Sequence, residues 1–256
     1  MLALISPTKK LDFSPSPMGL EYTQPAFMAE AMALMDVLGK LSARQLQKLM
    51  HLSDDLAAVN TERVNSFAAK QTPKNAKQAG YTYSGETFIG LDAENFSKTD
   101  VAYAQDHLRI FSGLYGILRP LDLIQPYRLE MGLRLKNSAG ADLYKFWGDK
   151  IAENIRKELA MEEEPVLVNL ASNEFTKAAN FKSLNARIVT PAFKEIKDGE
   201  AKTIGPFSKR ARGMMARFMI INRIEEPEDL KKFAADGYKF KAGLSDIDNW
   251  VFTRKA

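Results

Sequence analysis

The chain of 256 residues contains no cysteine and only two histidines, His51 and His107. Without cysteine there is no disulfide framework, no thiolate metal site and no thiol redox sensor. Neither histidine has a second metal-ligating histidine at helical or turn spacing, so a zinc or iron site of the His-rich kind is not indicated. The sequence therefore predicts no resident metal.

Long apolar runs are also missing. No stretch approaches the length that crosses a bilayer, and residues 1–5 lack the charged region of a signal peptide and are soon followed by Pro7. There is no Walker loop, no Gly-x-Gly-x-x-Gly after a strand and no Gly-x-Ser-x-Gly elbow, so no nucleotide cofactor is indicated. With 45% hydrophobic residues and a net charge of +4, we expect a cytoplasmic globular protein with no cofactor, no membrane contact and no obligate protein partner.

Two short segments are predicted to be strands buried on both faces of a sheet, because they are apolar apart from Asn169. They are residues 2–5 and 166–170, and polar groups follow each of them. Ligands collect at the carboxyl edge of open α/β sheets. If the two strands are parallel, Lys9 and Glu174 face one cleft. The length and these segments predict a mixed α/β fold, a single compact domain over 1–256 with a mixed sheet and surrounding helices.

The segment 97–128 has the most distinctive local pattern. Ser97 and Asp100 form an acidic capping box, apolar residues then recur on one helical face as far as Phe111, and Gly113 is a natural helix stop. A second glycine at Gly116 predicts a tight hairpin, and hence a helix-hairpin-helix-like element whose backbone N–H groups are open to phosphate. The alternative is a plain helix–helix corner. Four arginines surround the element: Arg109, Arg119, Arg128 and Arg134.

A second cationic segment lies at 208–224, which we expect to be a helix. Between Gly205 and Ile224 there are five basic residues and no acidic one. On a helix the five fall within an arc of roughly 160°, and they are Lys209, Arg210, Arg212, Arg217 and Arg223. Gly213 and Ala216 lie inside this arc, which leaves room for a polyanion. A solvated basic face is the alternative, but no acidic partner at helical spacing supports it, so we favour anion binding.

Other segments are predicted from periodicity alone. Residues 25–38 and 142–159 have helical spacing, the second with Trp147 in its buried stripe. Short strands are expected in two groups, the first at 81–83 and 87–91 and the second at 187–190, 201–204, 238–240 and 250–253.

Only one side chain stands out as a catalytic candidate. Lys9 follows a buried strand, and a lysine held beside buried structure is more readily deprotonated and becomes a base or nucleophile. Glu174 or Asp122 would assist it. The predicted ligands of phosphate are a larger set, namely Lys9, Lys10, Arg109, Gly113, Gly116, Arg119, Arg128, Arg134, Lys209, Arg210, Arg212 and Arg217.

Five segments carry distinctive motifs. They are 4–9 (Leu-Ile-Ser-Pro-Thr-Lys), 107–135, 144–149 (Tyr-Lys-Phe-Trp-Gly-Asp), 168–172 (Val-Asn-Leu-Ala-Ser) and 209–213 (Lys-Arg-Ala-Arg-Gly). Together they resemble the bacterial peroxide stress protein YaaA family. The resemblance covers essentially the whole chain, and the block Ser-Gly-Leu-Tyr-Gly-x-Leu-Arg-Pro-Leu-Asp is highly specific.

The resemblance implies a single mixed α/β fold with a positively charged cleft and a helix-hairpin-helix element that binds double-stranded DNA. It also implies protection from hydrogen peroxide by limiting unincorporated iron in the cell, with no established catalytic activity. Two positions depart from the motif Ser-Pro-Ala-Lys-Thr usual near the N-terminus of the family. They are Thr8 and Lys10, while the lysine itself is retained as Lys9.

The residues and the resemblance together predict a cytoplasmic DNA-binding protein of the oxidative stress response. It would hold the phosphate backbone without reading sequence and would limit iron-dependent damage. The alternative is an enzyme that acts on DNA or a nucleotide-like anion with Lys9 in the cleft. A third hypothesis, direct handling of iron by carboxylates, ranks below both because histidine is scarce and cysteine absent.

Overall fold

The strand β1, Leu2–Ile5, lies inside the main sheet with a parallel neighbour on each side. Its neighbours are β3 (Leu108–Ser112) and β6 (Val166–Leu170), with Ala3 opposite Leu108 and Val168. The computed structural model describes residues 1–15, 19–160 and 162–255. All three strands are buried along their whole length, as predicted for β1 and β6 but not for β3.

The main sheet has eight strands in the described part of the chain, in the order β4-β3-β1-β6-β7-β10-β9, with β8 paired to β7. The pairs from β3 to β10 are parallel, and the outer pairs are antiparallel. The remaining strands of this sheet are β4 (Gly116–Leu118), β7 (Arg187–Lys197), β8 (Glu200–Lys202), β9 (Lys239–Phe240) and β10 (Asn249–Lys255). A separate pair consists of β2 (Lys77–Gln78) and β5 (Leu123–Ile124).

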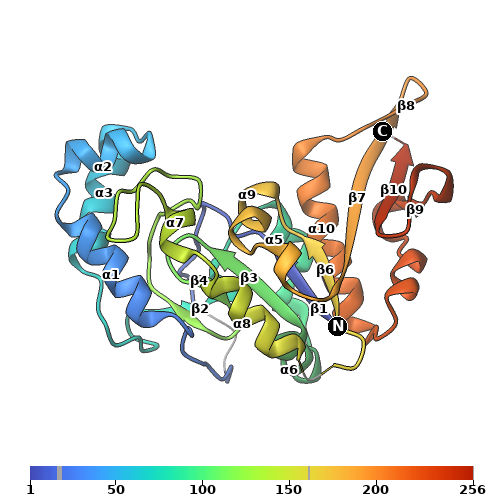
Figure 1. Ribbon diagram of the computed structural model, residues 1–256, viewed down its shortest axis with the longest axis horizontal. Coiled ribbons are helices and arrows are strands. Elements are labelled where there is room, and N and C mark those ends of the chain that lie inside the picture. Colours follow the sequence, from blue (N-terminus) through green and yellow to red (C-terminus); the bar gives the residue numbers. More distant parts are fainter. Residues whose placement is uncertain (16–18, 161, 256) are drawn as a thin grey trace.

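Helices lie on both faces of the main sheet (Figure 1). The long helix α10 packs on β1, β6 and β7, and α8 and α9 lie over the opposite face. The helix bounds are α1 (Met28–Gly39), α2 (Ala43–Met50), α3 (Asp54–Asn65), α4 (Ala79–Thr82), α5 (Glu86–Leu91), α6 (Lys98–His107), α7 (Leu143–Trp147), α8 (Lys150–Leu159), α9 (Asn173–Ala178) and α10 (Gly205–Ile221). Short 3₁₀ turns lie at Ala93–Asn95, Phe181–Ser183, Pro227–Lys232, Ala235–Gly237 and Ala242–Leu244. None of the described helices has both the length and the hydropathy needed to cross a membrane.

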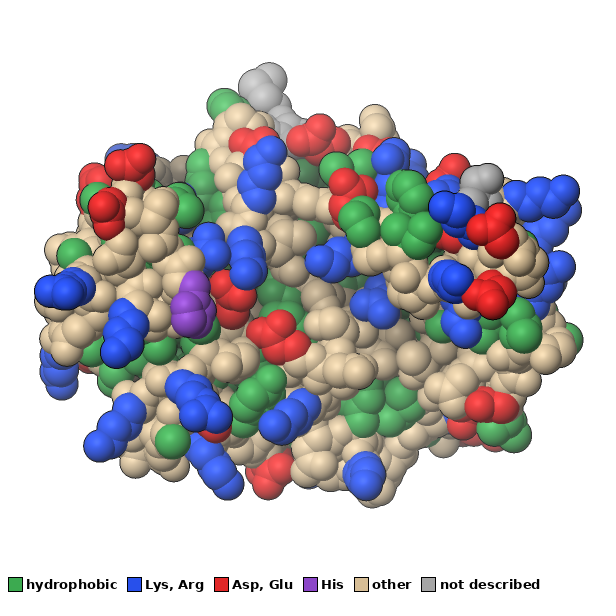
Figure 2. Space-filling model, turned by 90° about the horizontal axis from the view of Figure 1, so that it is seen from above, with side chains coloured by type: hydrophobic (Ala, Val, Ile, Leu, Met, Phe, Trp, Pro, Cys, Tyr) green, Lys and Arg blue, Asp and Glu red, His purple; other side chains and the backbone are tan. Residues whose placement is uncertain are grey.

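The carboxyl ends of β1 and β6 point towards the top of the molecule in Figure 1. Seen from above, this face is hollowed near its middle (Figure 2). Lys and Arg side chains surround the hollow, with Asp and Glu side chains among them. The mixed α/β fold predicted from the sequence is therefore confirmed, including the parallel arrangement of residues 2–5 and 166–170.

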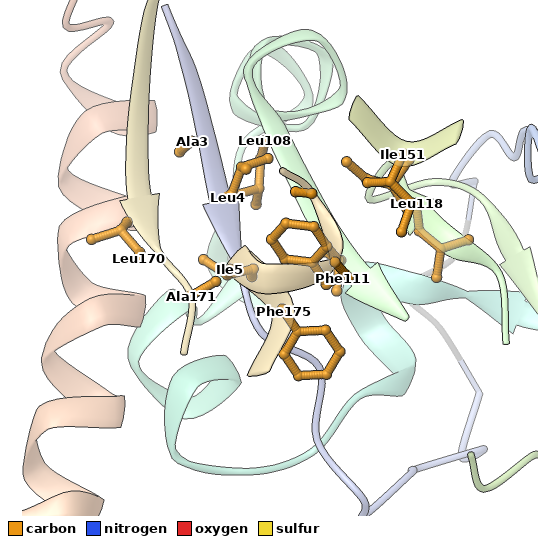
Figure 3. Packing of buried hydrophobic residues seen from close by; sticks show 14 of the residues in the cluster. Ala3, Leu4, Ile5, Leu108, Phe111, Leu118, Ile151, Leu170, Ala171 and Phe175 are labelled. Carbon is orange, nitrogen blue, oxygen red and sulfur yellow. The ribbon is translucent and has the colours of Figure 1, made fainter. Parts of the chain in front are cut away.

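The hydrophobic core fills the space between the sheet and its helices (Figure 3). Leu4, Ile5 and Phe111 are fully buried, and Phe111 stacks on Phe175 of α9 with ring centroids 5.6 Å apart. Trp147 is also fully buried, as expected of the helical stripe that carries it. Each buried aliphatic or aromatic side chain of this size contributes about 1.5–3 kcal/mol to folding, so the core holds the sheet edge below the hollow rigidly in place.

The region expected to be a helix-hairpin-helix element is folded differently. Its first helix begins at Lys98 with the predicted capping box, but it ends at His107. Residues 108–118 are the two strands β3 and β4, joined by a turn at Gly113–Tyr115. The helix-hairpin-helix prediction is wrong, because the apolar residues at 108–111 are buried on both sides as a central strand and not on one helical face.

Two other predictions of secondary structure are wrong: the short strands at 81–83 and 87–91, and the single helix at 142–159. Residues 81–83 and 87–91 lie mostly in helices α4 and α5 and not in strands. Helix α5 packs against α10, whereas α4 contacts the short strands β2 and β5. The expected helix 142–159 is divided at Gly148, whose φ of 48° lies in the left-handed region, into α7 and α8. The other predicted segments overlap observed elements of the same type, with ends shifted by a few residues as in α10, β8 and β10.

Helices α5 and α10 cross at very close range, and two glycines make this possible. A Cβ on Gly90 would lie 2.1 Å from the Arg210 carbonyl oxygen, and one on Gly213 would lie 1.8 Å from the Thr87 carbonyl oxygen. No real Cβ occupies such positions, so the two backbones would have to separate. Gly213 therefore serves helix packing and does not leave room for a polyanion.

This crossing yields a stability prediction. We expect Gly213→Ala to lower the free energy of unfolding by about 1–3 kcal/mol or more, because the added methyl group overlaps backbone atoms that cannot move independently. Gly205→Ala is the matched control, since nothing lies within 4 Å of a Cβ at that position of the same helix. Urea unfolding of both variants tests the idea, and equal stabilities would contradict it.

Candidate functional site

A pocket of about 260 Å³ opens at the carboxyl ends of β1 and β6. Its walls come from five separate segments: the loop after β1, Thr87 of α5, residues 127–130 after β5, the end of β6 with the start of α9, and the first turns of α10. This edge of a parallel sheet is where ligands bind in open α/β folds. The pocket is therefore the strongest candidate site on the described part of the molecule.

The loops after β1 and β6 are tied to each other directly. The backbone N–H of Ser172 donates to the Ser6 hydroxyl oxygen at 2.9 Å, and the Ser6 and Ser172 hydroxyl oxygens lie 3.4 Å apart. This contact follows from the parallel register, which places Ile5 opposite Leu170. Lys9 and Glu174, a few residues further along each loop, both line the pocket as the sequence predicted.

Four cationic and two anionic side chains line the pocket, which leaves two positive charges in excess. The cations are Lys9, Arg128, Lys209 and Arg212, and the anions are Glu130 and Glu174. Lys9 Nζ lies 2.7 Å from Glu130 Oε2, and Arg128 Nη2 lies 3.5 Å from Glu130 Oε1. Glu174 accepts a hydrogen bond from the backbone N–H of Gly132 at 2.9 Å. The site therefore offers hydrogen-bond donors and acceptors side by side.

Arg212 differs from the other cations in its surroundings. Its side chain is half-buried, and its Nε is fully buried with no hydrogen-bond partner among the described residues. Burial lowers the pKa of the Arg212 guanidinium, and no carboxylate offsets that effect. A buried donor without an acceptor costs about 1–3 kcal/mol, so a ligand acceptor that reached this atom would recover that cost.

The floor of the pocket combines apolar side chains with a buried hydroxyl group. Leu129, Leu170 and Phe175 are buried among the lining residues. The Tyr127 hydroxyl lies 2.6 Å from the hydroxyls of Ser112 and Tyr83. Burial raises the pKa of Tyr127 to about 12 and raises that of Tyr83 well above its usual value. The floor is therefore neutral and rigid at physiological pH.

The structure divides the predicted phosphate ligands into three groups. Lys9, Arg128, Lys209 and Arg212 line the pocket, and Arg210 is exposed on α10 beside them. Lys10 and Arg134 are exposed outside the pocket lining. The remaining members, discussed next, are in other environments.

Arg109 and Arg217 are structural residues. Arg109 is only 5% exposed, and its Nε lies 2.7 Å from Glu158 Oε2, so the prediction that it binds phosphate is wrong. Arg217 donates to the Asp92 carbonyl oxygen at 2.7 Å and also pairs with the Asp92 carboxylate. It therefore closes the carboxyl end of α5 instead of facing a ligand.

The glycine hairpin cannot present free amides either. Gly113 and Gly116 are buried, and a Cβ on Gly113 would lie 2.3 Å from the Leu129 carbonyl oxygen. The amides of the turn residues Leu114 and Tyr115 donate to the Ser112 hydroxyl oxygen at 3.2 and 3.0 Å. The expectation that this hairpin binds phosphate is contradicted, because its donors are used inside the fold.

Asp122 and Arg119 lie at a different, smaller cavity of about 130 Å³ with Arg109 and Glu158. Asp122 accepts from the Thr23 hydroxyl at 2.6 Å and from the Arg119 backbone N–H at 2.7 Å. Burial raises its pKa, partly opposed by these hydrogen bonds. Asp122 therefore holds a turn together and does not share a site with Lys9.

Lys9 itself lacks the enclosure on which its catalytic role was predicted. Its side chain is 60% exposed and forms the ion pair with Glu130. Sequence reasoning missed Glu130, although its place two residues after Arg128 was a usable signal. It also missed Arg63 of α3, whose pKa is lowered by burial and by the nearby charge of Arg128; nothing in the local sequence of α3 indicates that proximity.

No three His, Asp or Glu side chains come together as a potential metal site in residues 1–15, 19–160 or 162–255. The fold and the pocket define a mixed α/β protein with a cationic pocket at the carboxyl edge of its sheet. The chain belongs to the peroxide stress protein YaaA family, whose model matches residues 1–244.

Relatives of similar length match the whole chain. A UPF0246 protein of Dechloromonas aromatica (strain RCB) is 47% identical over 255 residues, which cover 100% of this chain and 99% of the relative. UPF0246 proteins of Ralstonia pickettii (strain 12J) and Ralstonia nicotianae (strain ATCC BAA-1114 / GMI1000) are each 48% identical, and this chain covers 99% and 100% of them. The family assignment supports a role in the response to peroxide.

The buried tyrosines predict a loss of stability at high pH. Between pH 10 and about 12 the unfolded chain releases the Tyr127 proton while the folded chain keeps it, so stability falls as pH rises. One tyrosine contributes a slope of up to about 1.4 kcal/mol per pH unit. We expect Tyr127→Phe to be less stable at pH 8 and to show a shallower decline above pH 10 in urea unfolding. Tyr22→Phe, at an exposed position, should keep the original slope; equal slopes in the two variants would contradict the prediction.

Proposed function

We propose that this member of the peroxide stress protein YaaA family binds double-stranded DNA through its phosphate backbone and so limits iron-dependent damage. The contact surface consists of the first turns of α10 and the mouth of the adjoining pocket. Lysine and arginine side chains would neutralise phosphates there without reading base sequence.

One observation carries this proposal: the cations of α10 are divided into a free group and a paired group. Lys209, Arg210 and Arg212, near the N-terminal end, form no ion pair among the described residues. Arg217 and Arg223, further along, pair with Asp92 and Asp100. If the cations of α10 served only to balance charges within the protein, each of them would be expected to form an ion pair with a carboxylate. The free group therefore supports an external anion as its partner.

The position of the free group adds support. It lies beside a pocket that itself carries excess positive charge, and the N-terminal end of α10 is on the side of the molecule towards which β1 and β6 point (Figure 1). Several cations on one face raise the local concentration of a polyanion and speed its association. The buried glycine hairpin has no part in this proposal, which relies on side chains instead of backbone amides.

Removal of two of these charges gives the first test. We expect Lys209→Ala combined with Arg210→Ala to weaken all duplexes alike and to reduce the slope of log K against log salt by about two, since each phosphate contact contributes about 0.9. Fluorescence anisotropy with two unrelated duplexes at several salt concentrations measures both quantities. Binding that is independent of salt would refute the proposal.

Arg217→Ala is the matched control for that experiment. It removes one positive charge from the same helix, but a charge that is already paired with Asp92. We expect reduced thermal stability and little change in DNA affinity at a temperature where the variant remains folded. An equal loss of affinity in both variants would mean that net charge, and not this surface, governs binding.

The link to iron has its own measurement. A supercoiled plasmid exposed to ferrous iron and peroxide acquires strand breaks, and bound protein is expected to reduce them. The double variant at Lys209 and Arg210 should protect less, in proportion to its weaker binding. Equal protection by both proteins would mean that protection from iron-dependent damage does not depend on DNA binding at this surface.

A second candidate function, an enzyme that acts on a nucleotide-like anion, is favoured by one observation: Lys9 and Glu174 line the same pocket. Its test is a covalent adduct with a base-lesion duplex that borohydride traps and that Lys9→Ala abolishes. The exposure of Lys9 and its pairing with Glu130 make this the weaker candidate.

A further inference from the structure

The pocket contains chemistry that phosphate binding does not use. Two carboxylates, Glu130 and Glu174, line it together with its cations. A carboxylate repels a phosphate group, so a pocket built only for phosphate would not contain two of them. The ligand of this pocket therefore has hydrogen-bond donors as well as acceptors.

The walls also have a shape and polarity of their own. Leu129, Leu170 and Phe175 supply buried apolar surface, while the half-buried guanidinium of Arg212 supplies hydrogen-bond donors. Ligand pockets typically combine apolar walls with a few placed polar groups in this way. A nucleobase fits both requirements: it has apolar flat faces, and its edge has acceptors on ring atoms and donors on any exocyclic amino group.

The rim supplies the remaining part of such a ligand. Lys209 lines the pocket and Arg210 is exposed beside it, both without an ion pair among the described residues. Both side chains are exposed, so a phosphate could contact them from outside the pocket. The rim therefore carries unpaired positive charge, and the interior combines apolar walls with polar groups. A nucleotide has the same order, with a charged phosphate at one end and a flat base at the other.

We propose that the pocket binds a single nucleotide whose base carries an exocyclic amino group, with the base inside and the phosphate at the rim. Arg212 would donate to a ring or carbonyl acceptor, and Glu174 would accept from the amino group. The nucleotide is either free or extruded from a DNA strand; the second source rests on the proposed function. Extrusion costs least for a mismatched base, because it is already poorly stacked and paired.

The first arm of the experiment tests extrusion from DNA. A duplex with one 2-aminopurine in a mismatch is titrated with the full chain, and anisotropy and 2-aminopurine fluorescence are recorded together. Stacking quenches this base, so entry into the pocket should raise its fluorescence several-fold at saturation. Arg212→Gln and Glu174→Gln should each remove most of the rise.

The second arm uses free ligands. Calorimetry compares AMP with inorganic phosphate, and AMP should bind more tightly because only AMP has a base. Each pocket substitution should weaken AMP by about tenfold, which corresponds to one hydrogen bond that involves a charged group. Lys232→Gln is the matched control, since it removes one exposed charge at a site remote from the pocket lining. It should change neither signal.

Both pocket variants should stay folded, which thermal melting checks. Arg212 has no ion pair to lose among the described residues, and a glutamine at 174 still accepts from the Gly132 amide. A rise in fluorescence or tight AMP binding that both variants abolish supports the inference. Phosphate that binds as tightly as AMP, or signals that neither variant changes, would overturn it.

The outcomes also separate this inference from the DNA proposal. If the duplex binds with steep salt dependence while fluorescence stays quenched and AMP does not bind, the pocket inference fails and DNA binding stands. If AMP binds in an Arg212-dependent manner while no duplex binds, DNA binding fails and the nucleotide pocket stands.

Discussion

The parallel hydrogen bonding of β1 with β6 is the constraint on which the candidate site depends. It brings residues that are about 165 positions apart in the chain to one edge of the sheet, as the contact between Ser6 and Ser172 shows directly. Both strands are buried on both faces. A shift in their register would therefore move side chains out of their packed positions in the core. A rigid edge of this kind holds the loops that carry Lys9 and Glu174 at a constant separation.

The second determinant is the close crossing of α5 and α10, which two glycines allow. It holds α10 at backbone contact distance from α5, and Lys209 and Arg212 of α10 line the pocket. The same crossing brings Arg217 to the carboxyl end of α5. There it pairs with the Asp92 carboxylate and donates hydrogen bonds to two backbone carbonyl groups. One helix therefore provides packing, local charge balance and the proposed anion-binding surface.

The charge pattern of the site explains why one pocket supports two linked proposals. Exposed cations without partners suit a polyanion of any sequence, whereas a half-buried guanidinium beside carboxylates and apolar walls suits one defined group. Backbone amides of the glycine hairpin contribute to neither, because Ser112 and the strand ladder already satisfy them. The family assignment is consistent with a role in peroxide stress, and the chemistry of the pocket suggests what such a protein would recognise.

Local patterns in the sequence determined much of the fold. Apolar composition identified β1 and β6, the Ser97–Asp100 capping box identified the start of α6, and the basic run identified α10. Lys9 and Glu174 were placed in one cleft from strand polarity alone. Only the tertiary structure decided which cations are free, since Arg109 and Arg217 find their partners far along the chain at Glu158 and Asp92. Residues 108–111 have the spacing of a helical face in the sequence, but they form a strand in the structure because both sides of that segment are buried in the core. Contacts between distant residues leave no local pattern, and for that reason the charge balance of the site was not readable before folding.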